Sequence, residues 1–197
     1  MRRLLVIGCA IGAGLISSGM PATAEDGSGG QDNVVYLHNT SDGNVLQRAR
    51  TAIAFDAGQS VTNQNTAQAV GQNCTGCRTV AVAVQVIIVE GYPSNFQPQN
   101  LALALNDNCT SCATFAYAYQ YVLQPGHRVT ISESGQERID HIRRQIDQVT
   151  RSGLDFPTMS AKLDGLSAQL VQVTQQEMRA NGDDEQGSAH RDVHEEG

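Results

Sequence analysis

The chain has 197 residues and a formal net charge of -7 at pH 7, with 13 basic and 20 acidic residues. Hydrophobic residues make up 40% of it and charged residues 17%, a balance that excludes both a bundle of membrane-spanning helices and a wholly disordered chain. The acidic excess argues against a nucleic acid-binding protein, and the length is enough for one domain or for a domain plus an appendage.

The first 24 residues have the order of a secretory signal peptide. A basic pair, Arg2 and Arg3, precedes an apolar run at 4–16, and the small residues 22–24 follow it. We predict cleavage after residue 24, with a signal anchor as the alternative. The mature protein is then secreted or held in the cell envelope, with no stable membrane insertion. Residues 25–32 are rich in glycine and predict a flexible linker.

An internal repeat organises the next part of the chain. Residues 65–85 and 100–120 align without a gap, and both read Asn-x-Ala-x-Ala, then Asn-Cys-Thr-x-Cys, then Thr-x-Ala-x-Ala-x-Gln. A decayed third copy precedes them, in which the turn at 40–43 takes the place of the C-x-x-C segment. We therefore predict a repeat domain over 33–125, with units at about 33–56, 65–89 and 100–123.

Each unit consists of a short alternating strand, a turn and a longer apolar strand. This is the pattern of a β-hairpin, and Asp42-Gly43 is a strong hairpin-turn signal. The longer strands, 78–89 and 113–123, are apolar on both faces, so both faces should be covered. We expect repeated antiparallel hairpins that form a small sheet or sandwich.

The C-terminal part changes to a helical period. A capping box at 134–137 opens a first helix, and a second helix runs from Pro157 to Asn181-Gly182. We predict a helical hairpin over 134–181 and an acidic disordered tail over 182–197, because no apolar period continues there. The expected fold class is α+β, with the repeated hairpins followed by the helical hairpin.

Four cysteines remain after signal cleavage removes Cys9, and they form two C-x-x-C pairs. An even number in an oxidising compartment favours disulfides, preferably within each turn, and no metal or cofactor. The alternative is a zinc site of four thiolates, since two C-x-x-C knuckles on hairpins resemble a zinc ribbon. A redox-active pair is a third interpretation, but strands are expected to flank both pairs, so neither has the helix N-terminus that usually lowers the pKa of a redox cysteine. The residues concerned are Cys74, Cys77, Cys109 and Cys112.

Two further features recur inside the strands. A row of aromatic residues occupies alternate positions of one strand and therefore lies on one face of it: Phe115, Tyr117, Tyr119 and Tyr121. We expect this row to be part of the core under the helices, with a carbohydrate-binding or peptide-binding surface as the alternative. Gln85 and Gln120 are expected to be buried amides that bond the backbone. The chain lacks G-x-S-x-G, P-loop and G-x-G-x-x-G motifs, and His190 and His194 lack the Glu of H-E-x-x-H, so we expect no catalytic residues.

The motif from Asn65 to Gln85, with its echo through Gln120, resembles an uncharacterised bacterial extracytoplasmic domain. That domain occurs in the C-terminal, non-catalytic region of peptide zinc metalloproteases, and the resemblance covers about 33–180. The proteases' H-E-x-x-H motif and membrane spans are absent from this sequence, so the resemblance implies an accessory module without protease activity. We expect a secreted, non-catalytic binding or structural module with a protein or peptide partner. The alternative is a zinc-binding accessory domain of a peptide-processing system.

Overall fold

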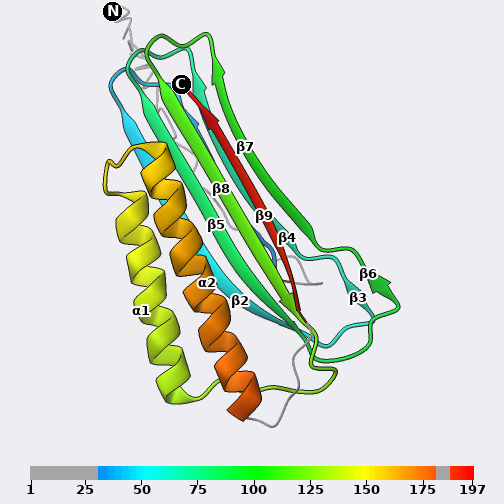
Figure 1. Cartoon of the computed structure of the whole chain (residues 1–197). Coiled ribbons are helices and arrows are strands. Elements are labelled where there is room, and N and C mark those ends of the chain that lie inside the picture. The colour runs from blue at the N-terminus through cyan, green and yellow to red at the C-terminus, as the bar shows by residue number, and fades with distance from the viewer. Residues whose placement is uncertain (1–30, 181–186) are drawn as a thin grey trace, which may run out of the picture.

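The computed structural model describes residues 31–180 and 187–197 (Figure 1). The expected signal peptide at 1–24 and all but the last two residues of the expected linker lie outside these ranges. The elements, in chain order, are β1 (Asn33–Asn39), β2 (Val45–Asp56), β3 (Ser60–Val61), β4 (Gln64–Gln72), β5 (Arg78–Val89), β6 (Asn95–Phe96), β7 (Gln99–Asp107), β8 (Ala113–Leu123), α1 (Glu133–Thr150), α2 (Phe156–Ala180) and β9 (Gly187–Glu196).

Equivalent strands of successive repeats pair with one another in parallel. Strands β1, β4 and β7 form sheet 1, strands β2, β5, β8 and β9 form sheet 2, and β3 pairs with β6. The register keeps the repeats in step, since Asn65 lies opposite Asn100 and Gln85 opposite Gln120. The repeat domain is thus a parallel β-solenoid in which each unit makes one coil. Its two long strands lie in facing sheets (Figure 1).

The fold class is confirmed as α+β with a C-terminal helical hairpin, but the pairing within each unit differs from the expected antiparallel hairpin. Strands β4 and β5 belong to different sheets, and the turn between them carries the chain from one sheet to the other. The turn bonds its neighbour one coil away, since Gly76 N–H donates to the carbonyl of Thr110 at 2.8 Å. Alternating side chains fit a hairpin and such an arch equally well, so the pattern could not distinguish them.

Small side chains fill the space between the two sheets. Because alanine is so small, the sheets can approach closely, and this makes an arch between them possible. The buried residues of this layer are Val35, Ala67, Ala69, Ala81, Ala83, Ala102, Ala104, Ala116 and Ala118.

The helical hairpin covers the outer face of sheet 2 (Figure 1). Helix α1 begins after Ser132, whose hydroxyl accepts the N–H of Gly135 at 3.1 Å, so the cap lies two residues before the expected one. Both helices bury aliphatic side chains against the valines of β5 and the aromatic row of β8. No helix within the described ranges has the length and apolarity needed to cross a membrane.

The prediction of a disordered tail is wrong for Gly187–Glu196, which forms strand β9. Strand β9 pairs antiparallel with β8 at the last coil of the solenoid. Its acidic side chains also reach sheet 1, where Asp192 accepts the backbone N–H of Ala102 at 2.8 Å. The segment is ordered through backbone pairing and carboxylate hydrogen bonds, and neither of them requires an apolar period in the sequence.

Candidate functional site

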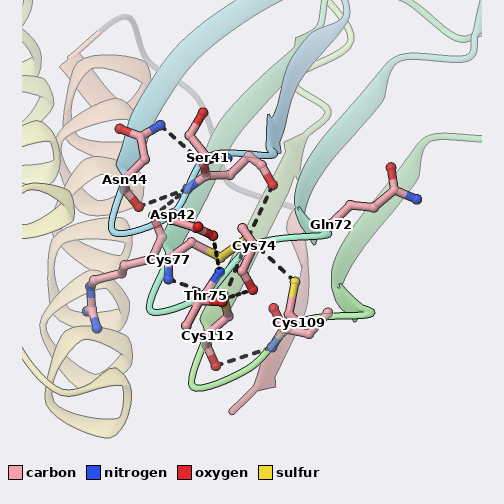
Figure 2. The surroundings of a disulfide bond; sticks show 12 residues. Ser41, Asp42, Asn44, Gln72, Cys74, Thr75, Cys77, Cys109 and Cys112 are labelled. Carbon is pink, nitrogen blue, oxygen red and sulfur yellow. Dashed lines mark hydrogen bonds between the residues drawn. A yellow bond between two sulfur atoms is a disulfide. The ribbon is translucent and has the colours of Figure 1, made fainter.

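The two C-x-x-C segments form stacked turns at one end of the coils (Figure 2). Thr75 and Thr110 form a parallel bridge between them. The turns share one backbone conformation, with positive φ at Asn73 and Asn108 and again at the third residue of each motif. The fold therefore brings both cysteine pairs to equivalent positions in adjacent coils.

All four Sγ atoms lie within 4.8 Å of one another. Cys74 and Cys77 form a disulfide, whereas Cys109 and Cys112 are free thiols. The Sγ atom of Cys74 lies 3.5 Å from that of Cys109 and 3.6 Å from that of Cys112. The structure thus has the expected pairing within the first turn and lacks it in the second, where both thiols lie against Cys74 of the neighbouring coil.

The cluster is largely shielded from solvent. Cys74, Cys77 and Cys112 are at most 6% exposed, and Cys109 is half-buried. The N–H of Cys77 donates to the Sγ of Cys112 at 3.2 Å. A Cβ at Gly71 would lie 3.3 Å from the Cys77 sulfur, so a residue without a side chain leaves room for the cluster.

The first coil carries the same turn without sulfur. Gly43 N–H donates to the carbonyl of Thr75, just as Gly76 N–H donates to the carbonyl of Thr110 one coil further on. Gly43 is therefore equivalent to Gly76, and Ser41 and Asn44 occupy the positions that the two cysteines have in the next coil. The side chain of Asp42 accepts the N–H of Thr75 at 2.7 Å. Among residues 31–180 and 187–197, the sulfur cluster is therefore confined to two coils and to four possible ligands.

The repeated glutamines are structural, as expected. Gln120 Nε2 donates to Gln85 Oε1 at 3.0 Å and contacts the carbonyl oxygens of Asn63 and Gln99. Gln85 Nε2 in turn donates to the carbonyl of Gln31 at 2.6 Å. Both Nε2 groups and the Oε1 of Gln85 are thus engaged within the coil stack.

A second amide stack was not assigned from the sequence. Asn33 donates to Asn65 Oδ1 and Asn65 donates to Asn100 Oδ1, both at 2.7 Å. The recurrence of asparagine at the start of each unit was the available signal. It became interpretable only once the strands were known to stack in parallel, because such a ladder needs equivalent residues in adjacent strands.

The aromatic row of β8 belongs to the core under the helices. Phe115 and Tyr117 are fully buried, and Tyr119 and Tyr121 pack at the edge of the same cluster. The Tyr117 hydroxyl donates to Asp164 at 3.0 Å, and burial raises the pKa of Tyr117 well above its usual value. This environment does not suit the carbohydrate or peptide surface considered as an alternative.

His190 and His194 lie on β9, where both are exposed. Across residues 31–180 and 187–197, the four cysteines are the one group of His, Cys, Asp and Glu side chains found with the spacing of a metal site. The structure keeps the two histidines outside any such group.

Sheet 1 has a very different outer face from sheet 2. Five large hydrophobic side chains on it are between 39% and 53% exposed. The strand register aligns the hydrophobic side chains of β1 with those of β7, and Thr66 and Gln68 of the central strand β4 lie between them. We call this set the outer apolar face: Val34, Tyr36, Leu101, Leu103 and Leu105.

No family model, curated protein or solved structure matches the chain.

Proposed function

We propose that this protein is a secreted or cell-envelope, non-catalytic module that binds a protein or peptide partner through the outer apolar face. The observation that carries the proposal is the set of large, exposed hydrophobic side chains on the parallel strands of sheet 1. Parallel sheets in globular proteins are usually covered on both faces, and sheet 2 follows this rule while sheet 1 does not. Large hydrophobic side chains that gather exposed on one face, here on the two outer strands with Thr66 and Gln68 between them, are typical of an interaction surface.

Polar side chains at one end of the outer apolar face support this role. His38 and Gln72 are hydrogen-bonded at 3.1 Å, and Gln72 Nε2 donates to Asp107 at 2.8 Å, so one side chain from each strand joins a ladder. Apolar side chains bordered by polar, hydrogen-bonded ones are common in protein interfaces. The ladder also links the ends of the three strands to one another.

The binding surface can be tested by site-specific cross-linking. A photoreactive residue introduced as Leu103→p-benzoylphenylalanine should cross-link the mature chain to a defined protein in envelope or culture fractions of the producing cells. The control is Tyr92→p-benzoylphenylalanine, because Tyr92 is 81% exposed in the loop between β5 and β6, away from the face. Adding Leu101→Glu should remove the cross-link at position 103 without changing the melting temperature. Equal cross-linking from both positions, or none from position 103, would contradict the proposal.

The proposed location has its own test. N-terminal sequencing of protein from outside the cytoplasm should begin at Glu25, since the small-residue site ends at Ala24. A chain that still starts at Met1 and sediments with membranes would support the signal anchor instead.

A further inference from the structure

We propose that the four-cysteine cluster, once the Cys74–Cys77 disulfide is reduced, is a site for one Zn²⁺ held by four thiolates. The proposal concerns a different part of the molecule from the outer apolar face and does not depend on partner binding.

The sulfur positions already approximate a tetrathiolate site. With zinc–sulfur bonds of about 2.3 Å, tetrahedral geometry separates the sulfurs by about 3.8 Å. The Sγ atom of Cys74 lies 3.5 Å and 3.6 Å from those of the two free thiols, and the whole set lies within 4.8 Å. Shifts of the side chains alone could bring four thiolates around one ion, because their turns are already stacked.

The fold supplies four ligands from two matching turns. Each turn contributes the first and last residues of a C-x-x-C segment, the arrangement of a zinc knuckle. The equivalent positions of the first coil are Ser41 and Asn44, so the row of sulfur ligands ends after two coils. Four sulfur ligands suit a closed structural zinc site, and soft thiolates select zinc over magnesium or calcium.

The surroundings of the cluster suit thiolates. The Cys77 N–H already points at the Cys112 sulfur, and a hydrogen-bond donor in that position stabilises a negative sulfur. Three of the ligands are buried, while half-buried Cys109 leaves a route by which the ion and a chelator could reach the site. Gly71 contributes no side chain on this side of the cluster, where a Cβ would crowd Asn106 Oδ1 and the sulfur of Cys77.

Formation of the site requires reduction first. A thiol reductant transfers two electrons and two protons to the Cys74–Cys77 disulfide, giving two thiols and an oxidised reductant disulfide. Binding of Zn²⁺ to the four cysteines then releases their thiol protons to solvent. Re-oxidation by a disulfide oxidant would reform the protein disulfide and release the ion. The same four sulfurs therefore serve either a disulfide or a metal.

The decisive experiment uses the mature chain without substitution, so it does not depend on a variant that folds. Protein reduced under anaerobic conditions is titrated with ZnCl₂, passed through a desalting column and analysed for metal. We expect one zinc per chain. The four thiols should resist iodoacetamide when zinc is bound and react after chelation. A reduced chain that retains no zinc, or whose thiols react equally with and without zinc, would overturn the proposal.

Substitution then assigns the ligands. Cys109→Ser should lower zinc affinity at least tenfold, whereas Thr110→Ala in the same turn should keep the wild-type affinity, because Thr110 contacts its neighbour through the backbone. Co²⁺ in place of zinc should give the absorption of a tetrahedral thiolate complex in the wild type and a weakened thiolate band in Cys109→Ser. Equal zinc affinity in Cys109→Ser and wild type would show that the metal binds elsewhere and would also overturn the proposal.

Discussion

Stacked amides form the interior polar contacts of the coils, and Asn65 occupies the middle of one stack. Its Nδ2 contacts the carbonyl oxygens of Ala83 and Tyr119 at 3.1 Å each, and its Oδ1 accepts from Asn33. One side chain thus connects both sheets and links its own coil to the coils on either side. Because the site is fully buried, water cannot replace a bond that is lost there.

Asn65→Ala should lower the free energy of unfolding by about 2–4 kcal/mol, since it leaves several buried partners unpaired. Urea unfolding followed by circular dichroism measures the change. Gln64→Ala is the matched control, because its side chain is exposed on the same strand, and it should change stability by less than about 0.5 kcal/mol. Similar losses in both variants would show that the asparagine stack contributes little.

Glu177 joins the two helices through a carboxylate with an altered pKa. Hydrogen bonds from Ser132, and then the guanidinium of Arg138 at 2.6 Å, hold the pKa of Glu177 below its usual value. A lowered pKa in the folded state means that ionised Glu177 stabilises the fold above the unfolded-state pKa of about 4.3. That contribution is lost as the pH falls through the lower folded-state pKa.

Glu177→Gln should therefore be less stable than wild type at neutral pH, and the difference should shrink as the pH falls below the unfolded-state pKa of about 4.3 and through the lower folded-state pKa. Urea unfolding at several pH values measures both curves. Glu137→Gln, at an exposed position of the same helical hairpin, should follow the wild type at each pH. A Glu177→Gln deficit that stayed constant with pH would show that the loss comes from packing and not from the carboxylate charge.

At the level of elements, β9 closes the last coil of the solenoid. It supplies backbone partners to β8, and its acidic side chains accept N–H groups from β7, including that of Asn106, which donates to Glu196 at 2.6 Å. Without β9, two adjacent strands would present unpaired backbone groups, and such edges promote association between chains.

Deleting 187–197 should lower the melting temperature by about 5 °C or more and cause concentration-dependent association, because the edge of β8 becomes exposed. Differential scanning calorimetry and sedimentation velocity measure these effects. Two single substitutions refine the test. Asp192→Ala should lower the free energy of unfolding by about 1 kcal/mol, because the N–H of Ala102 loses its acceptor, whereas Glu195→Ala, at an exposed position, should lower it by less than half of that. A monomeric truncated chain with wild-type stability would contradict the role of β9.

For the whole molecule, the alanine layer sets the distance between the two sheets. The helices lie on the opposite side of sheet 2, so the molecule has two unlike layers of packing, one thin and one thick (Figure 1). A thin layer has little free volume, and a larger side chain can be accepted only if the sheets separate.

Ala83→Leu should therefore destabilise the protein by about 1–3 kcal/mol, although leucine is more hydrophobic than alanine. Ala161→Leu is the control, because that alanine is exposed on α2, and it should leave stability within about 0.5 kcal/mol of wild type. Urea unfolding compares the two. Wild-type stability of Ala83→Leu would mean that the gap between the sheets can widen without cost.

Local features of the sequence determined much of the architecture. The 35-residue spacing identified equivalent positions, and the expected longer strands at 78–89 and 113–123 coincide with β5 and β8. The change to a helical period after the capping box at 134–137 predicted α1, and four cysteines in two matching C-x-x-C segments marked the candidate site. These features depend on residues close in the chain, whose period and turn chemistry can be read directly.

Only the tertiary structure decided which strands pair, whether the tail is ordered and how the sulfurs meet. A strand with alternating side chains can pair with the next strand in its unit or with its equivalent in the next unit, because the backbone offers the same donors and acceptors to either. The alanine layer and the stacked amides favour the second arrangement, and they act only when residues far apart in the chain lie together. The parallel stack then places Cys74 beside Cys109 and Cys112 and leaves an edge on β8 that orders β9.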